Sequence, residues 1–568
     1  MWNRWLRNAE RQPTQDAIIH WRVEGPPIRW TFSELMDAAE ICAVNLMENG
    51  IMRGEVCALI LRHHPWFYPL YLGCVRLGAI PAILAYPNPR LHPDKFRQGL
   101  IGMSQRSGLD WILTERDLEP VIQELAGGAD NTIKGVHFPL EWDSRHTPGS
   151  ETITKLNQMH NRISASDPLL LQHSSGTTGL QKPVMLSHLS VQEHIDRYAI
   201  ALGLDHNDKI ASWLPLYHDM GLIAAFHLPL ALGIPSIQIN PFEWVMAPSL
   251  LLDAVSKERA TVSWLPNFAL DMMADKIREE DLRDINLESW RMIVNCSEPV
   301  RYESHQKFRK RFQPYGLMPA SLSTCYAMAE TTFAVTQSTP ETEPAVLAVD
   351  RTALSRGKVE ISIDERNARI CVSSGTPISG CDVRIVDDAC RDLPEGMVGE
   401  FAIRSASMFD GYRNYPEKTA EVLRDGWYFS GDLGFKYGPD YFVVGRIKDI
   451  IIVAGNNIYP EDVEAAISAV SGVLPGRVVA FGQEQSELGT ERLCVMVETE
   501  LTDATGQKRL RMEILKAGMA IDVTIGSIYL VAPRFLIKSS AGKLSRQANK
   551  DRIGMIPDLL AQQGRTGL

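Results

Sequence analysis

Cysteine is scarce in this chain of 568 residues, and none of its nine cysteines belongs to a CxxC pair. This pattern excludes a disulfide framework and is typical of reduced thiols, so we expect a cytoplasmic protein. Internal repeats and low-complexity tracts are also absent. The length is too great for one ordinary hydrophobic core and predicts several domains.

Long uninterrupted apolar runs are missing as well. The most apolar stretch, residues 56–87, is interrupted by charged residues such as Arg62 and Arg76. A lipid-spanning helix needs about 20 mostly apolar residues, so a buried strand–helix–strand unit is the better interpretation. The first residues, MWNRWLRNAERQPTQDA, carry no apolar segment after their charges and predict no signal peptide.

An excess of positive charge is absent too, because the formal net charge is -11. Wholesale binding to nucleic acid is therefore not expected. Two helix-compatible stretches, residues 301–312 and 507–516, are basic by contrast. They are either docking surfaces for an acidic partner or ordinary solvated helix faces.

Strand and helix patterns alternate through the first part of the chain. Residues 56–61 and 78–84 are typical of buried parallel strands, and residues 31–49 and 188–202 have helical patterns. The pattern predicts an α/β fold with mixed, largely parallel sheets.

The amino-acid composition of the sequence changes after about residue 335. Residues 335–365 are first rich in Pro, Thr and Glu and then strongly charged, and short strands with turns follow over residues 383–412. These strands predict a β-rich subdomain. A boundary near 445–450 gives a large N-terminal domain, residues 1–445, and a small α+β C-terminal domain, residues 446–568.

The stretch QHSSGTTGLQKPVMLSH, residues 172–188, has the composition of a phosphate-binding loop. Its glycines allow close approach of the backbone to a ligand, and Lys182 adds a positive charge. We expect the loop between an apolar strand, residues 168–172, and a helix that begins near Ser187, where α/β proteins bind phosphate. The P-loop pattern GxxxxGK[ST] is absent, and a flexible turn is the alternative.

Four further stretches combine charged or aromatic residues with turns. In chain order they are STCYAMAETT (323–332), GWYFSGDLG (426–434), GRIKDIIIVAGNNIYPEDVE (445–464) and SSAGKLSR (539–546). Taken singly, each is better explained as a solvated turn or a surface loop than as a functional site.

Together and in this order, the five stretches resemble the adenylate-forming superfamily of acyl- and aryl-CoA synthetases, peptide-synthetase adenylation domains and luciferases. The resemblance extends from about residue 5 to residue 550. It is strongest to the fatty-acyl-AMP ligases, which share the patterns of SWLPLYHDMGLI (212–223) and of PNFAL with NCSEPVR (266–301). DRTALSRGKV (350–359) falls where that branch carries an extra segment, which packs against the C-terminal domain and disfavours CoA as acceptor.

The resemblance implies two half-reactions. A carboxylate attacks the α-phosphate of ATP to give acyl-AMP and pyrophosphate, and a thiol then attacks acyl-AMP to give a thioester and AMP. Because two anions must meet in the first step, catalysis should depend on positioning and on placed cations. The resemblance also implies Mg²⁺, a mobile C-terminal domain, an apolar carboxylic acid such as a fatty acid, and an acyl carrier protein as partner.

The resemblance further assigns roles to residues. Lys543 would bridge the carboxylate and the α-phosphate, Glu330 would bind Mg²⁺, and Lys448 would lie at a hinge between the domains. The nucleotide site would comprise Ser174, Ser175, Gly176, Thr177, Thr178, Gly179, Lys182, Ser297, Glu298, Tyr326, Ala327, Asp432 and Arg446.

The acyl pocket is expected where the HDMG and PNFA motifs meet. It would comprise Asp219, Met220, Leu222, Trp264, Phe268 and Met328, with His218 closing it. Asp219 belongs to the HDMG pattern, so we do not expect it to bind an ammonium group. Core packing is the alternative for each apolar side chain, and medium-chain, aryl and modified polyketide starter acids all remain open.

The sequence departs from the family in three places. Pro183 follows Lys182 where the loop usually has glycine, and Ala327 replaces glycine after the motif tyrosine. Cys296-Ser297 stands where the family pattern NGAEPVR has Gly-Ala. We interpret Cys296 as a small buried apolar residue. Three rival functions remain: a ligase that uses free CoA, a non-catalytic nucleotide-binding homologue, and a luciferase-like oxygenase.

Overall fold

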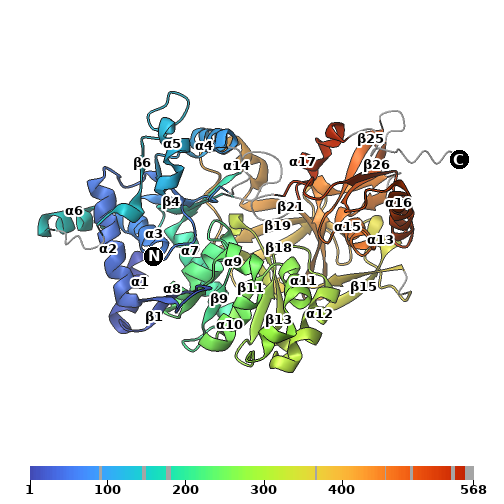
Figure 1. The fold of residues 1–568 in the computed structure, drawn as a ribbon, viewed down its shortest axis with the longest axis horizontal. Helices are drawn as coiled ribbons and strands as arrows, with labels where there is room; N and C mark the ends of the chain where they lie inside the picture. The colour runs from blue at the N-terminus through green and yellow to red at the C-terminus, as the bar shows by residue number, and fades with distance from the viewer. Residues whose placement is uncertain are drawn as a thin grey trace.

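The computed structural model describes residues 1–87, 93–143, 149–173, 181–364, 367–453, 456–485, 490–538 and 544–556. Figure 1 shows an elongated molecule in which the chain proceeds from one end to the other. The N-terminal elements form one end, a large sheet forms the middle, and the C-terminal elements form the opposite end. Within the described ranges, no helix has the length and apolar character needed to cross a membrane.

A nine-stranded sheet forms the middle of the molecule. Its strand order is β17-β14-β13-β12-β11-β9-β10-β1-β2, with parallel pairing from β13 to β1 and antiparallel pairing at both edges. The strands are β1 (Asp16–His20), β2 (Ile28–Thr31), β9 (Ile210–Ser212), β10 (Ser236–Gln238), β11 (Val262–Leu265), β12 (Met292–Asn295), β13 (Leu322–Ala327), β14 (Ala334–Gln337) and β17 (Thr376–Pro377).

The helices around this sheet begin where the sequence provides capping side chains. Thr31 accepts a hydrogen bond from the backbone N–H of Glu34 at the start of α2, and Ser187 caps α7 in the same way. The predicted helices are therefore confirmed. This part contains α1 (Trp2–Arg11), α2 (Phe32–Glu48), α7 (His188–Ala201), α8 (Leu228–Leu232), α9 (Pro241–Met246), α10 (Ser249–Glu258), α11 (Asn267–Lys276) and α12 (Tyr302–Phe312).

A second, four-stranded sheet is parallel throughout, in the order β4-β3-β5-β6. All five residues of β3 are buried, which explains its continuous apolar sequence. Both strands predicted here are confirmed. The elements are β3 (Val56–Ile60), α3 (Phe67–Leu77), β4 (Ile80–Ile83), α4 (Pro93–Ser107), β5 (Trp111–Thr114), α5 (Glu119–Ile122), β6 (Gly135–His137) and α6 (Ser150–His160).

The predicted β-rich subdomain is an antiparallel sheet preceded by a hairpin. The hairpin pairs β15 (Val346–Asp350) with β16 (Ala368–Val372) and carries the short helix α13 (Arg351–Ser355). The sheet contains β18 (Cys381–Val386), β19 (Gly399–Ser405), β20 (Leu423–Arg424), β21 (Trp427–Tyr437) and β22 (Asp440–Arg446), with α14 (Pro416–Val422) between β19 and β20.

The C-terminal elements form an α+β unit with hydrophobic clusters of its own. Val463 and Ile467 on α15 pack with Val495 on β26 and with Leu510 and Ile514 on α16. The elements are β23 (Ile451–Val453), β24 (Asn456–Ile458), α15 (Pro460–Ser468), β25 (Val478–Gln485), β26 (Thr490–Glu498), α16 (Ala504–Met519), β27 (Ser527–Val531) and α17 (Arg546–Lys550).

All nine cysteines are free, and eight of them are buried. Cys390, in a turn between β18 and β19, is partly exposed. Its backbone has a positive φ of 60°, as tight turns often require.

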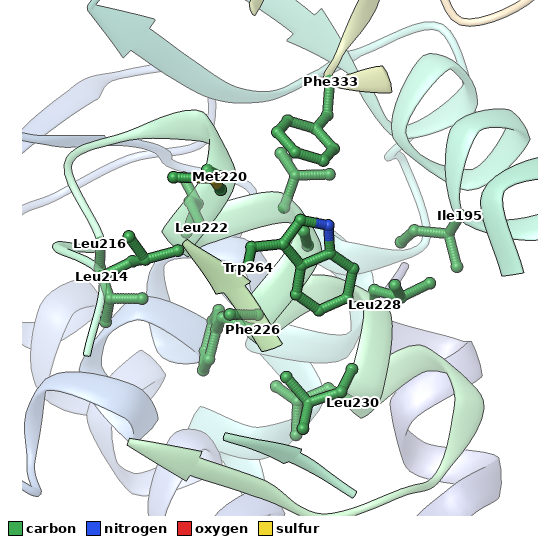
Figure 2. Packing of buried hydrophobic residues seen from close by; sticks show 14 of the residues in the cluster. Ile195, Leu214, Leu216, Met220, Leu222, Phe226, Leu228, Leu230, Trp264 and Phe333 are labelled. Atoms are coloured by element: carbon green, nitrogen blue, oxygen red, sulfur yellow. The ribbon is translucent and has the colours of Figure 1, made fainter. Parts of the chain in front are cut away.

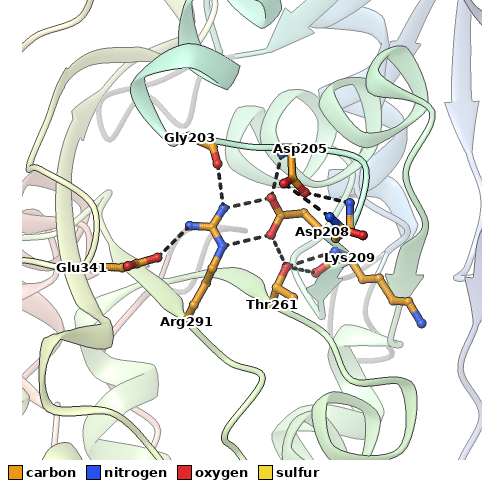
Figure 3. Close-up of polar contacts among 8 residues, drawn as sticks. Gly203, Asp205, Asp208, Lys209, Thr261, Arg291 and Glu341 are labelled. Atoms are coloured by element: carbon orange, nitrogen blue, oxygen red, sulfur yellow. Dashed lines mark hydrogen bonds and ion pairs between the residues drawn. The ribbon is translucent and has the colours of Figure 1, made fainter.

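An ion-pair network ties the amino ends of three central strands together (Figure 3). Arg291, just before β12, contacts both carboxylate oxygens of Asp208 at 2.9 Å. Asp208 lies before β9 and also accepts a 2.7 Å hydrogen bond from Thr261, just before β11. The network lies at the edge of the sheet opposite to the carboxyl ends of these strands.

Candidate active site

The predicted site residues gather where the central parallel strands end. His218 and Asp219 follow β9, Ser297 follows β12, and Glu330 follows β13. The carboxyl edge of a parallel sheet is the usual position of a ligand site in α/β proteins.

Tyr326, Asp432 and Arg446 form one hydrogen-bonded group. The Tyr326 hydroxyl donates to Oδ2 of Asp432 at 2.7 Å, and Nε of Arg446 lies 2.8 Å from Oδ1. Asp432 and Arg446 face each other on β21 and β22, and Asp432 is only 6% exposed. The charge of Asp432 raises the pKa of the Arg446 guanidinium. The structure therefore brings Tyr326 together with two residues that lie 106 or more positions later in the chain.

Glu330 is buried in a 3₁₀ turn, Ala329–Thr331, directly after β13. Its Oε1 accepts a 2.7 Å hydrogen bond from the hydroxyl of Tyr412. The same hydroxyl lies 3.3 Å from Nζ of Lys182, which donates to it. Burial lowers the pKa of Lys182, while the nearby charge of Glu330 acts in the opposite direction.

An additional strand lies between the expected phosphate loop and the helix that begins after Ser187. β7 (Pro168–His173) and β8 (Pro183–Ser187) form an antiparallel hairpin, and α7 begins only after β8. The expected strand before the loop and the helix start near Ser187 are both confirmed, whereas β8 was not predicted. Four of the five residues of β8 are buried, and pairing with β7 satisfies its backbone. The residues expected at the tip of the hairpin, Ser174, Ser175, Gly176, Thr177, Thr178 and Gly179, lie outside the described residues, as does Lys543.

Pro183 suits its position at the start of β8. Its carbonyl oxygen accepts a 2.9 Å hydrogen bond from the backbone N–H of Arg413. Proline at the first residue of a strand is well tolerated, because its missing N–H need not pair there.

Lys448 joins the other cations near these carboxylates. It lies in a 3₁₀ turn, Ile447–Asp449, directly after β22. Burial lowers the pKa of Lys448, and the charges of Arg446 and Lys182 lower it further. Three cations therefore lie near the buried carboxylates Glu330 and Asp432, an arrangement suited to a polyanion.

The apolar residues expected in the acyl pocket differ in exposure. Met220, Leu222 and Trp264 are packed in the core, as Figure 2 shows. Met328 is partly buried, and Phe268 is 39% exposed and packs beside Trp213.

Met220 and Leu222 lie in a π-helix, Met220–His227, which directly follows the HDMG histidine and aspartate. Nδ1 of His218 lies 2.7 Å from Oδ1 of Asp219, and that oxygen also accepts the backbone N–H of Met220 at 2.8 Å. π-Helical turns are rare and occur often at functional sites.

The segment after β12 connects the candidate nucleotide site with the candidate acyl pocket. Cys296 is fully buried, and its Sγ lies 3.0 Å from Sδ of Met220. Ser297 has a positive φ of 70°, an uncommon conformation that is frequent at binding sites. Oε2 of Glu298 accepts the backbone N–H of Phe268 at 3.1 Å. The burial of Cys296 agrees with its interpretation as a small apolar residue.

The two basic stretches differ in how their charges are used. On α12, Lys307 pairs with Asp275 at 2.6 Å and Arg309 pairs with Glu343 at 2.9 Å. Arg311 forms an ion pair with Glu279. On α16, Lys508 and Arg509 are exposed to solvent. Ion pairing within the chain therefore makes α12 the weaker candidate for docking an acidic partner.

Comparison with known protein families identifies the class of protein to which this chain belongs. The family described as "AMP-binding enzyme" matches residues 5–413, so the chain belongs to that family. It is an adenylate-forming ligase of a superfamily whose members use ATP, and the predicted likeness to the fatty-acyl-AMP ligases is confirmed.

Named relatives cover most of the chain. The probable long-chain-fatty-acid–AMP ligase FadD30 of Mycobacterium tuberculosis is 33% identical over 68% of this chain and 70% of its own. The medium-chain-fatty-acid–[acyl-carrier-protein] ligase JamA of Moorena producens is 29% identical over 91% and 88%. A putative acyl-CoA synthetase of Caulobacter vibrioides is 27% identical over 91% and 89%.

A solved structure confirms the fold. A structure from a study of fatty acyl-adenylate ligases of E. coli and L. pneumophila superposes with a TM-score of 0.86 and 24% identity, covering 97% of both chains. The predicted α/β architecture with a β-rich subdomain is therefore confirmed.

Proposed function

We propose that this enzyme activates a fatty acid with ATP and transfers the acyl group to the phosphopantetheine thiol of an acyl carrier protein. The observation that carries the proposal is the group of cations, Lys182, Arg446 and Lys448, near the buried carboxylates Glu330 and Asp432. The likeness to FadD30, named a probable fatty-acid–AMP ligase, and to JamA, named a carrier-protein ligase, supports it.

In the first half-reaction, the side chains of the site position two anions and balance their charge. Lys182 would contact the terminal phosphates together with the 174–179 loop. Asp432 would accept hydrogen bonds from the ribose hydroxyls, because a carboxylate has lone pairs for two donors, and Arg446 would orient it. Tyr326, Ala327, Ser297 and Glu298 would line the adenine side, and Lys543 would bridge the attacking carboxylate and the α-phosphate.

Glu330 would hold Mg²⁺. Bound Mg²⁺ neutralises phosphate charge, and it is commonly held by one or two carboxylates together with substrate phosphates. In the part of the chain that the structure describes, no three His, Cys, Asp or Glu side chains are grouped as a self-contained metal site. A single carboxylate beside the phosphate-binding cations fits this shared mode of Mg²⁺ binding.

The acid would bind beside the π-helix, with His218 and Asp219 at the entrance. Its apolar chain would contact Met328 and Phe268, while Met220, Leu222 and Trp264 form the packed wall behind. Asp219 already contacts His218 and the backbone of Met220, which supports a structural role over ammonium binding.

The hairpin β15–β16 supports a carrier protein as the acceptor. Nε of Arg369 on β16 lies 3.2 Å from Oδ1 of Asp462 on α15, and its guanidinium stacks on the Tyr459 ring at 4.7 Å. Arg351 approaches the same Asp462 at 3.7 Å. Figure 1 shows β15 and α13 beside the C-terminal elements. We infer that these contacts, within the 335–365 segment and its flank, restrain the small domain, residues 446–568, against the large one, residues 1–445.

The decisive experiment measures pyrophosphate release with ATP and Mg²⁺ over fatty, aryl and amino acids. Each acid is tested with CoA, with a holo carrier protein, and with neither. We expect acyl-AMP from fatty acids and thioester only with the carrier. Efficient formation of acyl-CoA would overturn the acceptor, and pyrophosphate release with none of the acids would overturn the proposed activity.

A further inference from the structure

A tyrosine hydroxyl connects the phosphate-side lysine with the metal-side carboxylate. The Tyr412 hydroxyl donates to Oε1 of Glu330 at 2.7 Å and accepts from Nζ of Lys182 at 3.3 Å. The Lys182 ammonium also lies 5.0 Å from the centre of the Tyr412 ring, within cation–π range. The positive and negative groups are thus joined through a single oxygen atom.

The backbone around Tyr412 is bound to both neighbouring segments. The N–H of Met185 on β8 donates to the carbonyl of Gly411 at 3.1 Å, and the N–H of Asp410 donates back to Met185 at 3.0 Å. On the other side, the N–H of Phe409 donates to the carbonyl of Glu330 at 2.8 Å. The segment 409–413 therefore joins the strand that leaves the phosphate loop to the turn that carries Glu330.

The Tyr412 ring is also held in place. Tyr412 is 3% exposed, and its ring packs against Phe409 with centroids 5.1 Å apart. Its backbone N–H donates to Oγ1 of Thr419 on α14 at 2.9 Å. The hydroxyl is consequently oriented before any nucleotide binds, and little conformational freedom is left to lose.

We propose that Tyr412 is a positioning residue that holds Lys182 and Glu330 at the spacing required by the Mg²⁺-bearing pyrophosphate end of ATP. The inference rests on the proposed function, which assigns the phosphates to Lys182 and the metal to Glu330. A direct contact between lysine and carboxylate would satisfy both groups and fill the space between them. The hydroxyl instead occupies one lone pair of the carboxylate and leaves the others available.

The test is the Tyr412→Phe variant, which keeps the ring and removes only the hydroxyl. We expect its affinity for ATP with Mg²⁺, measured by calorimetry without acid, to fall about tenfold, the scale of one hydrogen bond to a charged group. The Mg²⁺ concentration needed for half-maximal pyrophosphate release should rise similarly, while KM for the acid stays unchanged.

Tyr441→Phe is the matched control. Tyr441 is a buried tyrosine on β22 of the same subdomain, and its hydroxyl donates to the carbonyl of Val383 at 2.9 Å, in a different contact. Its removal should leave ATP affinity unchanged. If Tyr412→Phe binds ATP with Mg²⁺ like the wild type, or if Tyr441→Phe loses affinity equally, the positioning role is refuted.

A double variant separates positioning from direct contact with the nucleotide. If Tyr412 acts partly through Lys182, the loss caused by Tyr412→Phe should shrink in a Lys182→Met background. An equal loss in both backgrounds would refute action through Lys182. Because calorimetry reports ATP binding without turnover, a wild-type protein that binds ATP but activates no acid would refute the proposed function while still testing Tyr412.

Discussion

Two histidines of the core are fully enclosed by apolar and hydrogen-bonding neighbours. His194 and His227 are 1% and 0% exposed. The backbone N–H of Ala334 donates to Nε2 of His194 at 3.3 Å, which requires that nitrogen to be unprotonated. Burial lowers the pKa of each imidazole from 6.5 to about 3.

These histidines predict a loss of stability in acid. Because the folded-state pKa lies below the unfolded value, the unfolded chain binds protons first as pH falls. The stability is complete above about pH 6.5 and declines toward pH 3, by about 2 kcal/mol per histidine between pH 6.5 and 5. Urea unfolding at about pH 7 and 5 checks this, and His227→Phe should flatten the dependence. The exposed His206 is the control, and an equal effect of His206→Asn would contradict the prediction.

The role assigned to Lys543 predicts that its replacement slows the adenylation step itself. We expect Lys543→Ala to slow adenylation about 10²- to 10³-fold, the scale of losing one preorganised charge-stabilising donor. Acid-dependent exchange of labelled pyrophosphate into ATP measures it, with Lys516→Ala on α16 as a surface control. Near-normal exchange in Lys543→Ala would contradict the assigned role.

The sequence identified the residues of the site better than the contacts between residues that are distant in the chain. Tyr326, Asp432 and Arg446 were predictable because each belongs to a recognisable motif. Their convergence joins β13 of the central sheet to β21 and β22 of the antiparallel sheet, and no local pattern encodes that contact. Tyr412 was missed because its contacts reach back 230 residues to Lys182 and 82 to Glu330. Only an aromatic residue after Gly411 marked the position, and that local pattern does not predict such distant partners.

At the scale of elements, the short turn after β22 is the expected hinge. Lys448 lies within the turn, and its neighbour Asp449 pairs with Arg546 at 3.0 Å, so the turn is joined to the end of the chain. β8 illustrates the limit of local prediction at this scale. Its apolar sequence directly precedes a helix start, and only pairing with β7 distinguishes it as a strand.

A proline in that turn should separate the two half-reactions. Proline fixes φ near -65° and removes an N–H, so Lys448→Pro should restrict rotation. We expect adenylation to be retained and thioester formation to fall about tenfold or more, with Lys448→Ala as the control for the lost charge. Acyl-AMP and thioester are quantified separately in the same reaction. Equal loss of both steps would count against a hinge at this position.

The contact of the hairpin with α15 predicts a change of acceptor. Arg369→Met keeps an apolar stem over Tyr459 but loses the ion pair with Asp462. If this contact restrains the small domain against CoA, acyl-CoA formation should rise several-fold while carrier loading stays within about twofold. Arg404→Met, which removes an exposed arginine paired with Asp382, is the control. If Arg369→Met uses CoA no better than the wild type, the hairpin contact does not explain the preference for a carrier protein over CoA.

At the scale of the whole molecule, two hydrophobic clusters lie within the proposed C-terminal domain, and a third crosses its boundary. One cluster takes its buried side chains from Ile451 to Leu530, and a second takes its own from Val479 to Ile556, among the residues that the structure describes. A cluster containing Tyr459, Phe435 and Phe442 crosses the proposed boundary. The alternation of strands and helices predicted the layers, but the side-by-side position of the hairpin and α15 depends on contacts that no local pattern encodes.

An isolated fragment tests this division. We expect residues 446–568 to fold alone, because its two clusters do not require the large domain. Circular dichroism should show a cooperative thermal transition, at a lower temperature than in the full chain because Tyr459 loses its partners. A matched fragment with Val495→Asp should not fold, since it places a charge in the cluster. A non-cooperative transition in the unmodified fragment would contradict the boundary.

The distribution of thiols makes the native chain suitable for optical study. With eight of nine cysteines buried, a maleimide dye should react selectively at Cys390, on the β-rich subdomain. A second cysteine introduced on the exposed face of α16 would complete a donor–acceptor pair across the turn that contains Lys448. Single-molecule energy transfer would then test whether the two proposed domains rotate during turnover, without first removing the natural cysteines.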